Sequence, residues 1–591
     1  MRAFLAVSLA PQAAERLRHP VEAAVACLAD DDVAVARVDP AADGWVAFTD
    51  PDDTDLLGEP GGAFTVVLGK LLRTRDADLS AADVVALLTG GSDAGLTALL
   101  PPFAAVHRGR AGGPIVAAND WLGFRQLYWW RGDGAAAVST SARALAVLAG
   151  APLDLDGLGT QAMMGWQITD QTIYEGVRAC PPATLASLDG GALRIRQYAE
   201  PVSQDGPAPA LEDAVAEMSD ILTRWQTAYL EAHPESVLQL TGGHDSRILL
   251  GATPEKLRNG MRALTLGSET SPDVVIAARL ARRYGIRHEV YRLDEHAPPS
   301  PEHAHRLALS ASKALETLGS PMALAPLLSV EAKLDQGHRL SGLGGEVARG
   351  FYYAGQPVGA QTSPALVERL ARWRLFSNEA VDAAALDKDF HAAAQAYTHK
   401  TLAGLFPAGD WLRATDHFYL YHRMHRWSAA HGTAAAVRRH FVNPMFDRRF
   451  IELALGVAPA DKRDSLLLGR IMSRLDAELA RIPLDTGLVP ARLGTRSMAT
   501  RMTVATATAR KVAGKVRQRL TNARRPQLGA AEIADLVLQH WRADPTVCQA
   551  LYESPLVNRQ WLDGLLNGEH GAAATTMTFL VNLVVVAEQH R

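Results

Sequence analysis

The sequence predicts an α/β protein in two parts: an N-terminal α+β sandwich, and a doubly wound parallel-sheet domain that ends in C-terminal helices. The first third of the chain has short β-type runs separated by Gly, Asp and Pro, which is typical of strand-rich folds. After residue 210, strands alternate with helices, which favours a parallel sheet with helices on both faces. From about Asp410 the pattern is mostly helical. A length of 591 residues is enough for more than one domain.

The composition is that of an ordinary globular protein, and it argues against several classes of function. The chain has 60 Lys and Arg against 64 Asp and Glu, so a net charge of −4 favours neither nucleic acid nor an anionic membrane as a partner. Its cysteines, Cys27, Cys180 and Cys548, are far apart, which excludes a disulfide-dense scaffold and Cys-rich metal motifs. They suit a reducing compartment, and we expect a cytoplasmic protein.

The N-terminus mimics a signal peptide only loosely. Met1–Ala10 has a single basic residue, Arg2, before a short apolar run, and the polar Gln12 and Glu15 follow almost at once. We therefore expect a first β-strand here. No run of about 18 apolar residues occurs elsewhere, so we expect no membrane partner.

Further strands of the first part are marked by apolar runs between turn residues. We expect them at Gly44–Thr49, Ala63–Leu68, Pro114–Ala118 and Ala136–Thr140. The segment Pro201–Pro209 has the composition of a linker. It places the predicted domain boundary between residues 1–205 and 206–591.

The second part begins with a strand and a Gly-rich loop, and the alternation then repeats. Its strands are expected at Ser236–Leu240, Met261–Leu266, His288–Leu293 and Arg339–Leu340. Ser271 is a helix N-cap with Pro272 in the first turn, and Gly285 ends that helix. Ligands of such sheets bind at the carboxyl ends of the strands, where the Gly-rich loops fall.

The loop from Thr241 to Ser246 is the strongest chemical signal in the chain. Gly242 and Gly243 let backbone amides approach an anion, and a helix that begins at Asp245 directs its positive end at the same point. The hydroxyls of Thr241 and Ser246 add donors, and Asp245 is suited to magnesium. The Gly-Lys-Ser/Thr ending of a Walker A loop is absent. A plain Gly-Gly turn with a helix cap is the alternative interpretation.

This loop resembles the Ser-Gly-Gly-x-Asp-Ser pyrophosphate loop of the asparagine synthetase-type ATP pyrophosphatases, with Thr241 in place of the first Ser. Further segments match the family in order, over most of residues 210–490: Leu264–Gly267 with Ser271–Asp273, Ser341–Glu346 and, more weakly, Asn443–Asp447. The resemblance implies an adenine nucleotide α-hydrolase-like fold with ATP and magnesium as cofactors. The cofactor-binding residues that it implies are Leu240, Thr241, Gly242, Gly243, Asp245, Ser246, Leu266, Gly267, Ser341 and Gly342.

Three departures from the family pattern concern the catalytic residues. Glu346 replaces a magnesium-binding Asp, so Asp245 and Glu346 are the expected metal ligands; an ordinary acid at a helix start is the alternative. Leu343 stands where relatives carry Glu or Tyr, so their acid/base partner is missing. Arg470 aligns with a Lys that stabilises the charged intermediate, and we expect the same electrostatic role, against a solvated helix arginine.

The first part resembles a class II glutamine amidotransferase, an Ntn-hydrolase-like domain. The segments Asn119–Tyr128 and Ser139–Leu145 carry this resemblance. Members of that family use an N-terminal Cys, whereas Arg2 follows Met1 here and Cys27 cannot become terminal. An Asn-Gly-Glu segment is also missing near Ala63–Leu72. We expect an inactive glutaminase domain that shapes a substrate cleft.

Without an ammonia supply, ATP is still expected to adenylate a carboxylate, releasing pyrophosphate, and the amine must come from the substrate. Relatives with this combination close rings, and the favoured role is macrolactam closure of a lasso-type peptide between its N-terminal amine and an Asp or Glu side chain. The segment Asp416–Trp427 mixes aromatic and cationic residues, as a peptide-holding wall would, although a helix with one aromatic core face fits equally. Its histidines, His417, His422 and His425, lack a recognised zinc spacing.

Other functions stay open. The closest alternative is a small-molecule amide or β-lactam synthetase, and a different class is a non-catalytic scaffold that binds nucleotide or a maturation partner. Nucleotide thiolation is disfavoured because no Cys pair lies near the loop. Expected partners are the substrate and a precursor-processing protease or leader-binding protein. The basic segment Arg501–Arg525 fits contact with such a partner or a solvated stretch.

Overall fold

The structure is a computed structural model of the chain. It describes all residues except 1–2, 30–34, 42–43, 50–54, 60–62, 74–78, 111, 205, 293–297, 335, 436–438, 494–528 and 590–591. The basic segment Arg501–Arg525 lies outside the described residues.

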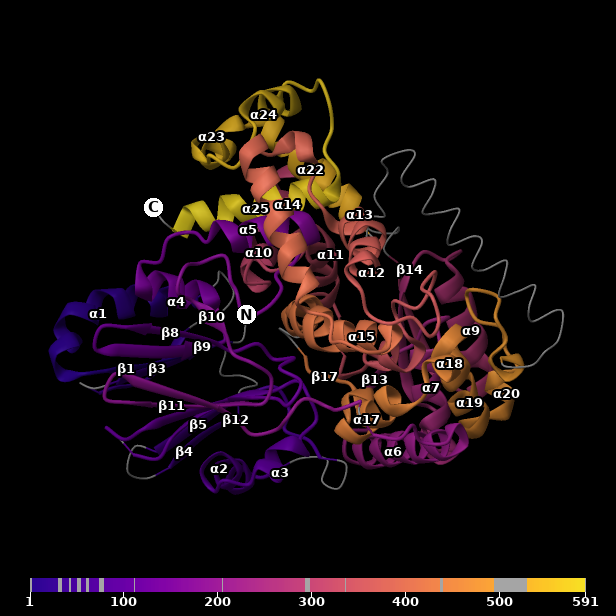
Figure 1. The fold of residues 1–591 in the computed structure, drawn as a ribbon. Coiled ribbons are helices and arrows are strands. Elements are labelled where there is room, and N and C mark those ends of the chain that lie inside the picture. The colour runs from indigo at the N-terminus through magenta and orange to yellow at the C-terminus, as the bar shows by residue number, and fades with distance from the viewer. Residues whose placement is uncertain are drawn as a thin grey trace.

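The N-terminal part is a four-layer sandwich in which two antiparallel sheets face one another between two pairs of helices (Figure 1). The first sheet has the order β10-β8-β9-β1-β3-β2 and consists of β1 (Phe4–Leu9), β2 (Val35–Ala41), β3 (Gly44–Thr49), β8 (Tyr128–Gly132), β9 (Ala135–Ser139) and β10 (Arg178–Ala179). The second has the order β12-β11-β7-β6-β5-β4 and consists of β4 (Asp55–Glu59), β5 (Ala63–Leu68), β6 (Ala104–Arg108), β7 (Ile115–Asn119), β11 (Thr184–Asp189) and β12 (Ala192–Gln197). The outer layers contain α1 (Pro11–Ala26) and α4 (Ala142–Ala149) on one side, and α2 (Ala81–Thr89) and α3 (Asp93–Thr97) on the other.

The apolar run at the N-terminus forms strand β1, which is buried on both of its faces. The side chains of Phe4 and Ala6 belong to the core between the two sheets, whereas Leu5 and Val7 belong to the core beneath the helices. Successive side chains of a strand point to opposite faces, so a strand buried on both faces is apolar at nearly every position. The expected strand is confirmed, and it is a central strand of its sheet.

The second part is built on a five-stranded sheet in which every pairing is parallel. Its order is β15-β14-β13-β16-β17, and its strands are β13 (Val237–Gln239), β14 (Arg262–Gly267), β15 (Arg287–Arg292), β16 (Arg339–Leu340) and β17 (Phe441–Val442). From β13 the chain adds β14 and then β15 on one side. It then crosses back and adds β16 and β17 on the other side of β13. The loops that follow β13 and β16 therefore lie together at the point where the winding reverses, which is where such sheets bind ligands.

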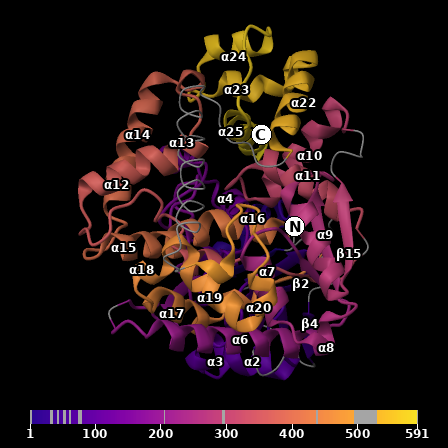
Figure 2. The same ribbon diagram turned by 90° about the vertical axis from the view of Figure 1, so that its right-hand side faces the viewer.

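Helices cover this sheet and extend beyond it. Between residues 155 and 331, and between 448 and 480, the α-helices are α5 (Leu155–Met164), α6 (Leu211–Ala232), α7 (Asp245–Ala252), α8 (Glu255–Arg258), α9 (Pro272–Tyr284), α10 (Pro301–Ala314), α11 (Pro321–Glu331), α17 (Arg448–Gly456), α18 (Pro459–Lys462), α19 (Leu466–Leu475) and α20 (Ala477–Ala480). A second group contains α12 (Pro364–Leu370), α13 (Phe376–Glu379), α14 (Lys388–Ala403), α15 (Trp411–Phe418) and α16 (Ala429–Ala435). The C-terminal helices α22 (Ala530–Ala543), α23 (Gln549–Glu553), α24 (Arg559–Leu566) and α25 (Ala574–Gln589) gather at one end, beside α10 and α11 (Figures 1 and 2).

Several short segments are helical but not α-helical. Residues Gly345–Arg349, Ala383–Ala385, Pro444–Phe446, Arg463–Ser465, Pro490–Arg492 and Pro545–Cys548 form 3-10 turns. Residues Ala371–Leu375 and Tyr419–Ser428 form π-helices. π-Helices are rare, and the single-turn form that interrupts an α-helix is frequently found at functional sites.

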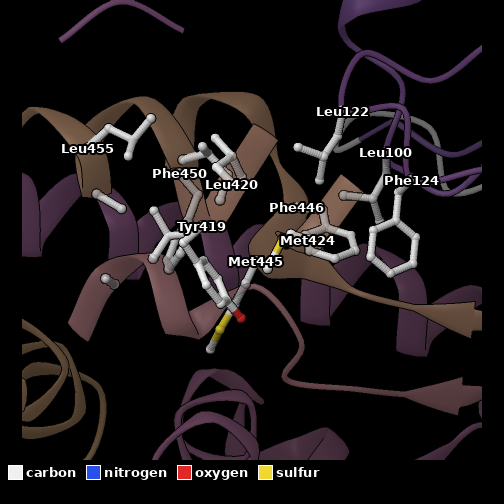
Figure 3. Close-up of a cluster of buried hydrophobic side chains, with 14 of the residues drawn as sticks. Leu100, Leu122, Phe124, Tyr419, Leu420, Met424, Met445, Phe446, Phe450 and Leu455 are labelled. Carbon is white, nitrogen blue, oxygen red and sulfur yellow. The ribbon is translucent and has the colours of Figure 1, made fainter. Parts of the chain in front are cut away.

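The two parts share one hydrophobic core across the linker. Figure 3 shows Leu122 and Phe124 of the sandwich beside Met424 and Phe446 of the second part, and all four belong to the largest buried cluster. The chain therefore packs as one continuous body on either side of Pro201–Pro209. Of the helices that the structure describes, none combines the length and apolar character needed to cross a membrane.

Candidate functional site

The loop after β13 is held by its own polar groups. The Thr241 amide donates a hydrogen bond to Ser246 Oγ at 3.0 Å, and the Gly243 amide donates to Thr241 Oγ1 at 3.2 Å. The Gly242 amide donates to Asp273 Oδ1 at 2.7 Å, at the start of α9. Helix α7 begins at Asp245, as expected. One amide of the loop, that of Gly242, therefore already donates to a carboxylate oxygen, that of Asp273.

The loop after β16 approaches Asp245 so closely that only glycine fits at two positions. A Cβ atom on Gly342 would lie 2.7 Å from the Asp245 Cβ, and one on Gly345 would lie 2.3 Å from Asp245 Oδ1. Gly344 has a φ of +108°, in the region that favours glycine. The Gly-rich pattern of this segment is thus explained by its contact with the loop after β13.

The two carboxylates predicted to bind magnesium meet at one arginine. Arg349 Nη2 lies 3.5 Å from Asp245 Oδ2 and 3.3 Å from Glu346 Oε1. Glu346 Oε2 also accepts a hydrogen bond from the Gly344 amide at 3.1 Å. Burial raises the pKa of Asp245 to about 7, with Arg349 opposing the shift and Glu346 adding to it. A divalent cation beside Asp245 would favour its charged form.

These residues fit a magnesium ion. Asp245 Oδ1 is buried and has no hydrogen-bond partner among the described residues, and carboxylate oxygens are the ligands that magnesium prefers. Within the described part of the chain, no group of three or more His, Cys, Asp or Glu side chains is arranged to hold a metal. Two carboxylates would fill part of the coordination shell of a magnesium ion. Phosphate oxygens and water would fill the rest, which is the usual arrangement for magnesium with a nucleotide.

Arg349 is the part of this arrangement that the sequence did not indicate. Its guanidinium forms ion pairs with both carboxylates, and Asp245 is the main reason that the pKa of Arg349 is raised above its ordinary value. Glu346 and Arg349 are three residues apart within one helical turn, and this spacing brings oppositely charged side chains together. That spacing was the available signal, but it did not predict the contact with Asp245.

The remaining predicted nucleotide residues lie along the carboxyl edge of the sheet. The amide of Leu240, just after β13, donates to the Leu264 carbonyl at 3.0 Å. Leu266 and Gly267 end β14, and a Cβ atom on Gly267 would come within 2.8 Å of Ser271 Oγ. Ser341 Oγ accepts a hydrogen bond from the Leu343 amide at 3.3 Å. These residues therefore share one edge with the two Gly-rich loops.

Arg470 lies on α19 and is half exposed, and its recorded partner is Glu212, with Arg470 Nε 3.8 Å from Glu212 Oε1. Among the described residues, no ion pair joins Arg470 to Asp245 or Glu346. Its role in stabilising an intermediate stays a prediction. Leu343 packs against the largest hydrophobic cluster, which accords with an apolar residue at that position.

The segment Asp416–Trp427 is helical, as expected: Asp416–Phe418 end α15, and the residues from Tyr419 onward belong to a π-helix. The ring of Tyr419 stacks on Phe351, with centroids 4.5 Å apart and planes at 26°. Tyr419 also interacts electrostatically with Glu346 and Arg349, while burial raises its pKa well above the ordinary value. One end of the π-helix therefore lies beside the carboxylate pair.

The other face of the π-helix is held by the sandwich. Gln126 Nε2 donates to the backbone carbonyl of His425 at 3.0 Å, and Arg426 Nη2 donates to Gln167 Oε1 at 3.1 Å and to the Gln171 carbonyl at 2.6 Å. A Cβ atom on Gly123 would come within 2.8 Å of the His425 ring. The N-terminal part thus fixes the position of an element that reaches the candidate site.

The two buried cysteines, Cys180 and Cys548, show no sign of activation. Cys180 and Cys548 are buried, and burial raises the pKa of both thiols, that of Cys548 to about 12. The Sγ of Cys27 accepts a contact from Arg143 Nη2 at 3.9 Å. A buried thiol with a raised pKa is a poor nucleophile, because the thiolate is the reactive form.

Comparisons with known proteins give little beyond distant structural likeness. No family model matches the chain, and no curated protein matches it significantly. A structure described as the allosteric regulatory enzyme of purine biosynthesis has 10% identity and a TM-score of 0.22, over 49% of this chain and 80% of that one. Glutamine phosphoribosylpyrophosphate amidotransferase from B. subtilis, complexed with ADP and GMP, has 11% identity and the same TM-score, over 49% and 65% of the two chains. At such low scores, fold and function rest on the residues of this chain.

Proposed function

We propose that the chain is an ATP- and magnesium-dependent, AMP-forming amide synthetase. The observation that carries this proposal is the meeting of Asp245 and Glu346 at the carboxyl edge of a parallel sheet, beside the loop Thr241–Ser246. Nucleotide phosphates need backbone amides, a helix N-terminus and a cation in one place, and these residues supply the first two and ligands for the third.

In this proposal Asp245 and Glu346 hold magnesium, which when bound neutralises phosphate charge. The amides and hydroxyls of Thr241–Ser246 contact the pyrophosphate portion of ATP, and Leu266–Gly267 lie on its adenine side. Asp273 makes room for a phosphate oxygen by giving up the hydrogen bond from the Gly242 amide. Arg349 and, as the sequence predicted, Arg470 supply positive charge as negative charge develops.

The reaction that fits these groups has two balanced steps. A substrate carboxylate oxygen bonds to the α-phosphorus of ATP, and the bond from that phosphorus to the bridging oxygen breaks to release pyrophosphate. An amine nitrogen then attacks the acyl carbon, AMP leaves with the former carboxylate oxygen, and the nitrogen loses a proton. The favoured substrate is a lasso-type peptide whose N-terminal amine closes a macrolactam on an Asp or Glu side chain.

The N-terminal part has a supporting role in this proposal. Residues 1–205 would form an inactive glutaminase-like domain that positions the π-helix, and residues 206–591 the synthetase domain. The amine would come from the substrate itself, so a precursor-processing protease that exposes the peptide's N-terminus is the expected partner.

The test is pyrophosphate release by the full-length protein with ATP, magnesium and a leaderless precursor peptide. Asp245→Asn keeps the shape of the side chain and removes its charge, so it should reduce the rate at least about a hundredfold. Asp220→Asn, on α6, is the matched control and should leave the rate unchanged.

Different results separate the alternatives. Pyrophosphate release with a small amino acid alone would point to a small-molecule synthetase instead of a peptide cyclase. Full turnover by Asp245→Asn would contradict the magnesium assignment. Tight ATP binding without pyrophosphate exchange for any carboxylate would indicate a scaffold.

A further inference from the structure

Two arginines from two separate π-helices converge beside the candidate site. Arg374 comes from Ala371–Leu375, and its guanidinium carbon lies 5.8 Å from the ring centroid of Phe351 and 5.5 Å from that of Tyr352. Arg423 comes from Tyr419–Ser428 and lies 5.6 Å from the same Phe351 ring. Segments that are distant in sequence therefore place two cations near one ring, that of Phe351.

The charge of this pair is only partly balanced. Glu379 is the residue, among those described, whose carboxylate comes within 4 Å of either guanidinium, and it lies 3.8 Å from Arg423 Nη2. Burial and the charge of Arg423 both lower the pKa of Arg374. Two neighbouring, largely buried cations that repel one another, only one of which is paired with a carboxylate, are costly unless another negative group joins them.

The pair lies next to the groups that would activate a carboxylate. Phe351 follows Arg349 by two residues, and its ring stacks on Tyr419, which interacts with both Glu346 and Arg349. The stack of Phe351 and Tyr419 therefore lies near the arginine pair through Phe351 and interacts electrostatically with Glu346 and Arg349 through Tyr419. A substrate with its reacting carboxylate at one end would present its neighbouring groups to Arg374 and Arg423.

The pair can be reached from outside, and its surroundings are aromatic. The side chain of Arg423 is 12% exposed and that of Glu379 is 22% exposed, while Trp373, next to Arg374, is 39% exposed. The guanidinium of Arg423 also lies 4.4 Å from the Trp427 ring centroid. Arg374 Nη2 donates to the Phe351 carbonyl at 3.4 Å and Arg423 lies beside Glu379, so the remaining N–H groups of the two guanidiniums are the ones that can bind a further carboxylate.

We propose that Arg374 and Arg423 form a second anion-binding subsite, which binds a carboxylate of the peptide substrate other than the one that is activated. The subsite selects a peptide with at least two acidic groups, or one acidic side chain and a free C-terminal carboxylate. This inference rests on the proposed function for the identity of the ligand. A nucleotide phosphate shares the same chemistry, and the experiment distinguishes the two sources.

The experiment measures binding of two fluorescein-labelled hexapeptide amides to the full-length protein, with magnesium and a non-hydrolysable ATP analogue present. Each peptide has one Asp, and three residues later one peptide has Glu and the other Gln. The wild-type protein should bind the Glu peptide about tenfold more tightly. Arg374→Gln and Arg423→Gln should each remove this preference. Arg372→Gln, an exposed neighbour in the same π-helix, should retain it.

Each result of these binding measurements either supports or contradicts the proposed subsite. Equal binding of both peptides by the wild type, no binding of either, or a preference that survives in both variants would overturn the proposal. Weaker binding of the ATP analogue by the variants, with the peptide preference intact, would assign the pair to phosphate instead and equally overturn it. If Arg423→Gln fails to fold, as judged by circular dichroism, Arg374→Gln and Arg423→Lys carry the test. A Glu preference without pyrophosphate release would support the subsite and contradict only the proposed reaction.

Discussion

The ring of Phe124 in the sandwich lies 4.7 Å from the ring of Phe446 in the second part, with the two planes at 50°. Phe446 is in turn close to the loop after β16, because a Cβ atom on Gly344 would lie 2.9 Å from the Phe446 ring. One ring pair therefore connects the N-terminal part to the loop that carries Glu346.

Replacing Phe124 with a smaller residue should weaken the packing between the N-terminal part and the second part. Phe124→Ala removes a fully buried ring and leaves a cavity, so the free energy of unfolding should fall by about 3–5 kcal/mol. Urea denaturation followed by circular dichroism measures the change. Phe124→Leu, which keeps most of the volume, should be much milder. Equal losses for the two variants would show that cavity formation is not the cause.

Adding a methyl group at Gly345 should disturb the carboxylate pair directly. The new Cβ atom would lie 2.3 Å from Asp245 Oδ1, far inside contact distance, so Asp245 or the loop must move. Gly345→Ala should weaken magnesium–ATP binding about tenfold or more in isothermal titration calorimetry. Gly571→Ala is the matched control, because a Cβ atom there meets nothing within 4 Å. Unchanged binding by Gly345→Ala would remove this loop from the nucleotide site.

The hydrogen bond from Gln126 should hold the π-helix in place. Gln126→Leu leaves the carbonyl of His425 without its side-chain donor, at a cost of about 1–3 kcal/mol. Hydrogen exchange across residues 419–428 should become faster, as peptide mass spectrometry would detect. Gln197→Leu removes a similar but exposed hydrogen bond to the Pro182 carbonyl and should not affect this segment. Unaltered exchange in Gln126→Leu would mean that the sandwich does not fix the π-helix.

The histidines of the π-helix should make the protein sensitive to acid. Burial is the main cause that lowers the pKa of His422 and of His425 from 6.5 to about 3. Below pH 6.5 the unfolded chain binds protons that the folded chain does not, so stability falls as the pH decreases toward 3. At pH 5 each histidine should cost about 2 kcal/mol relative to pH 7.5.

Urea denaturation at pH 7.5 and 5.0 measures this loss. His422→Gln should reduce the difference between the two pH values, whereas replacement of the exposed His19 by Gln should not. An unchanged pH dependence in His422→Gln would contradict the assignment.

The sequence predicted those features whose signal is local. Apolar runs between turn residues marked β3 and β5 with their observed bounds, and the Ser271–Pro272 start and Gly285 end of α9 are confirmed. The sequence also predicted that the two Gly-rich loops lie at the same edge of the sheet, because parallel strands bring their carboxyl ends to one edge. These elements needed no knowledge of tertiary contacts.

Features that depend on tertiary packing were missed. The contact of Arg349 with Asp245 joins residues that are far apart in the chain, and nothing in either neighbourhood indicates it. The π-helix at Tyr419–Ser428 has the same alternation of apolar and polar residues as an α-helix, so its wider turn could not be distinguished. The contact between Arg470 and Glu212 depends on how α19 packs against α6.

The order of the strands along the chain has a consequence for biosynthesis. Both sheets of the sandwich are complete by Gln197, whereas the carboxylate pair needs residues 245–349 and the π-helix ends only at Ser428. The ribosome therefore synthesises all strands of the sandwich before it synthesises the carboxylate pair and the π-helix. Domains generally fold as they emerge, beginning with the N-terminal one. The strands of the N-terminal part are then available first, and the later helices of the nascent chain complete the cores that they share with it.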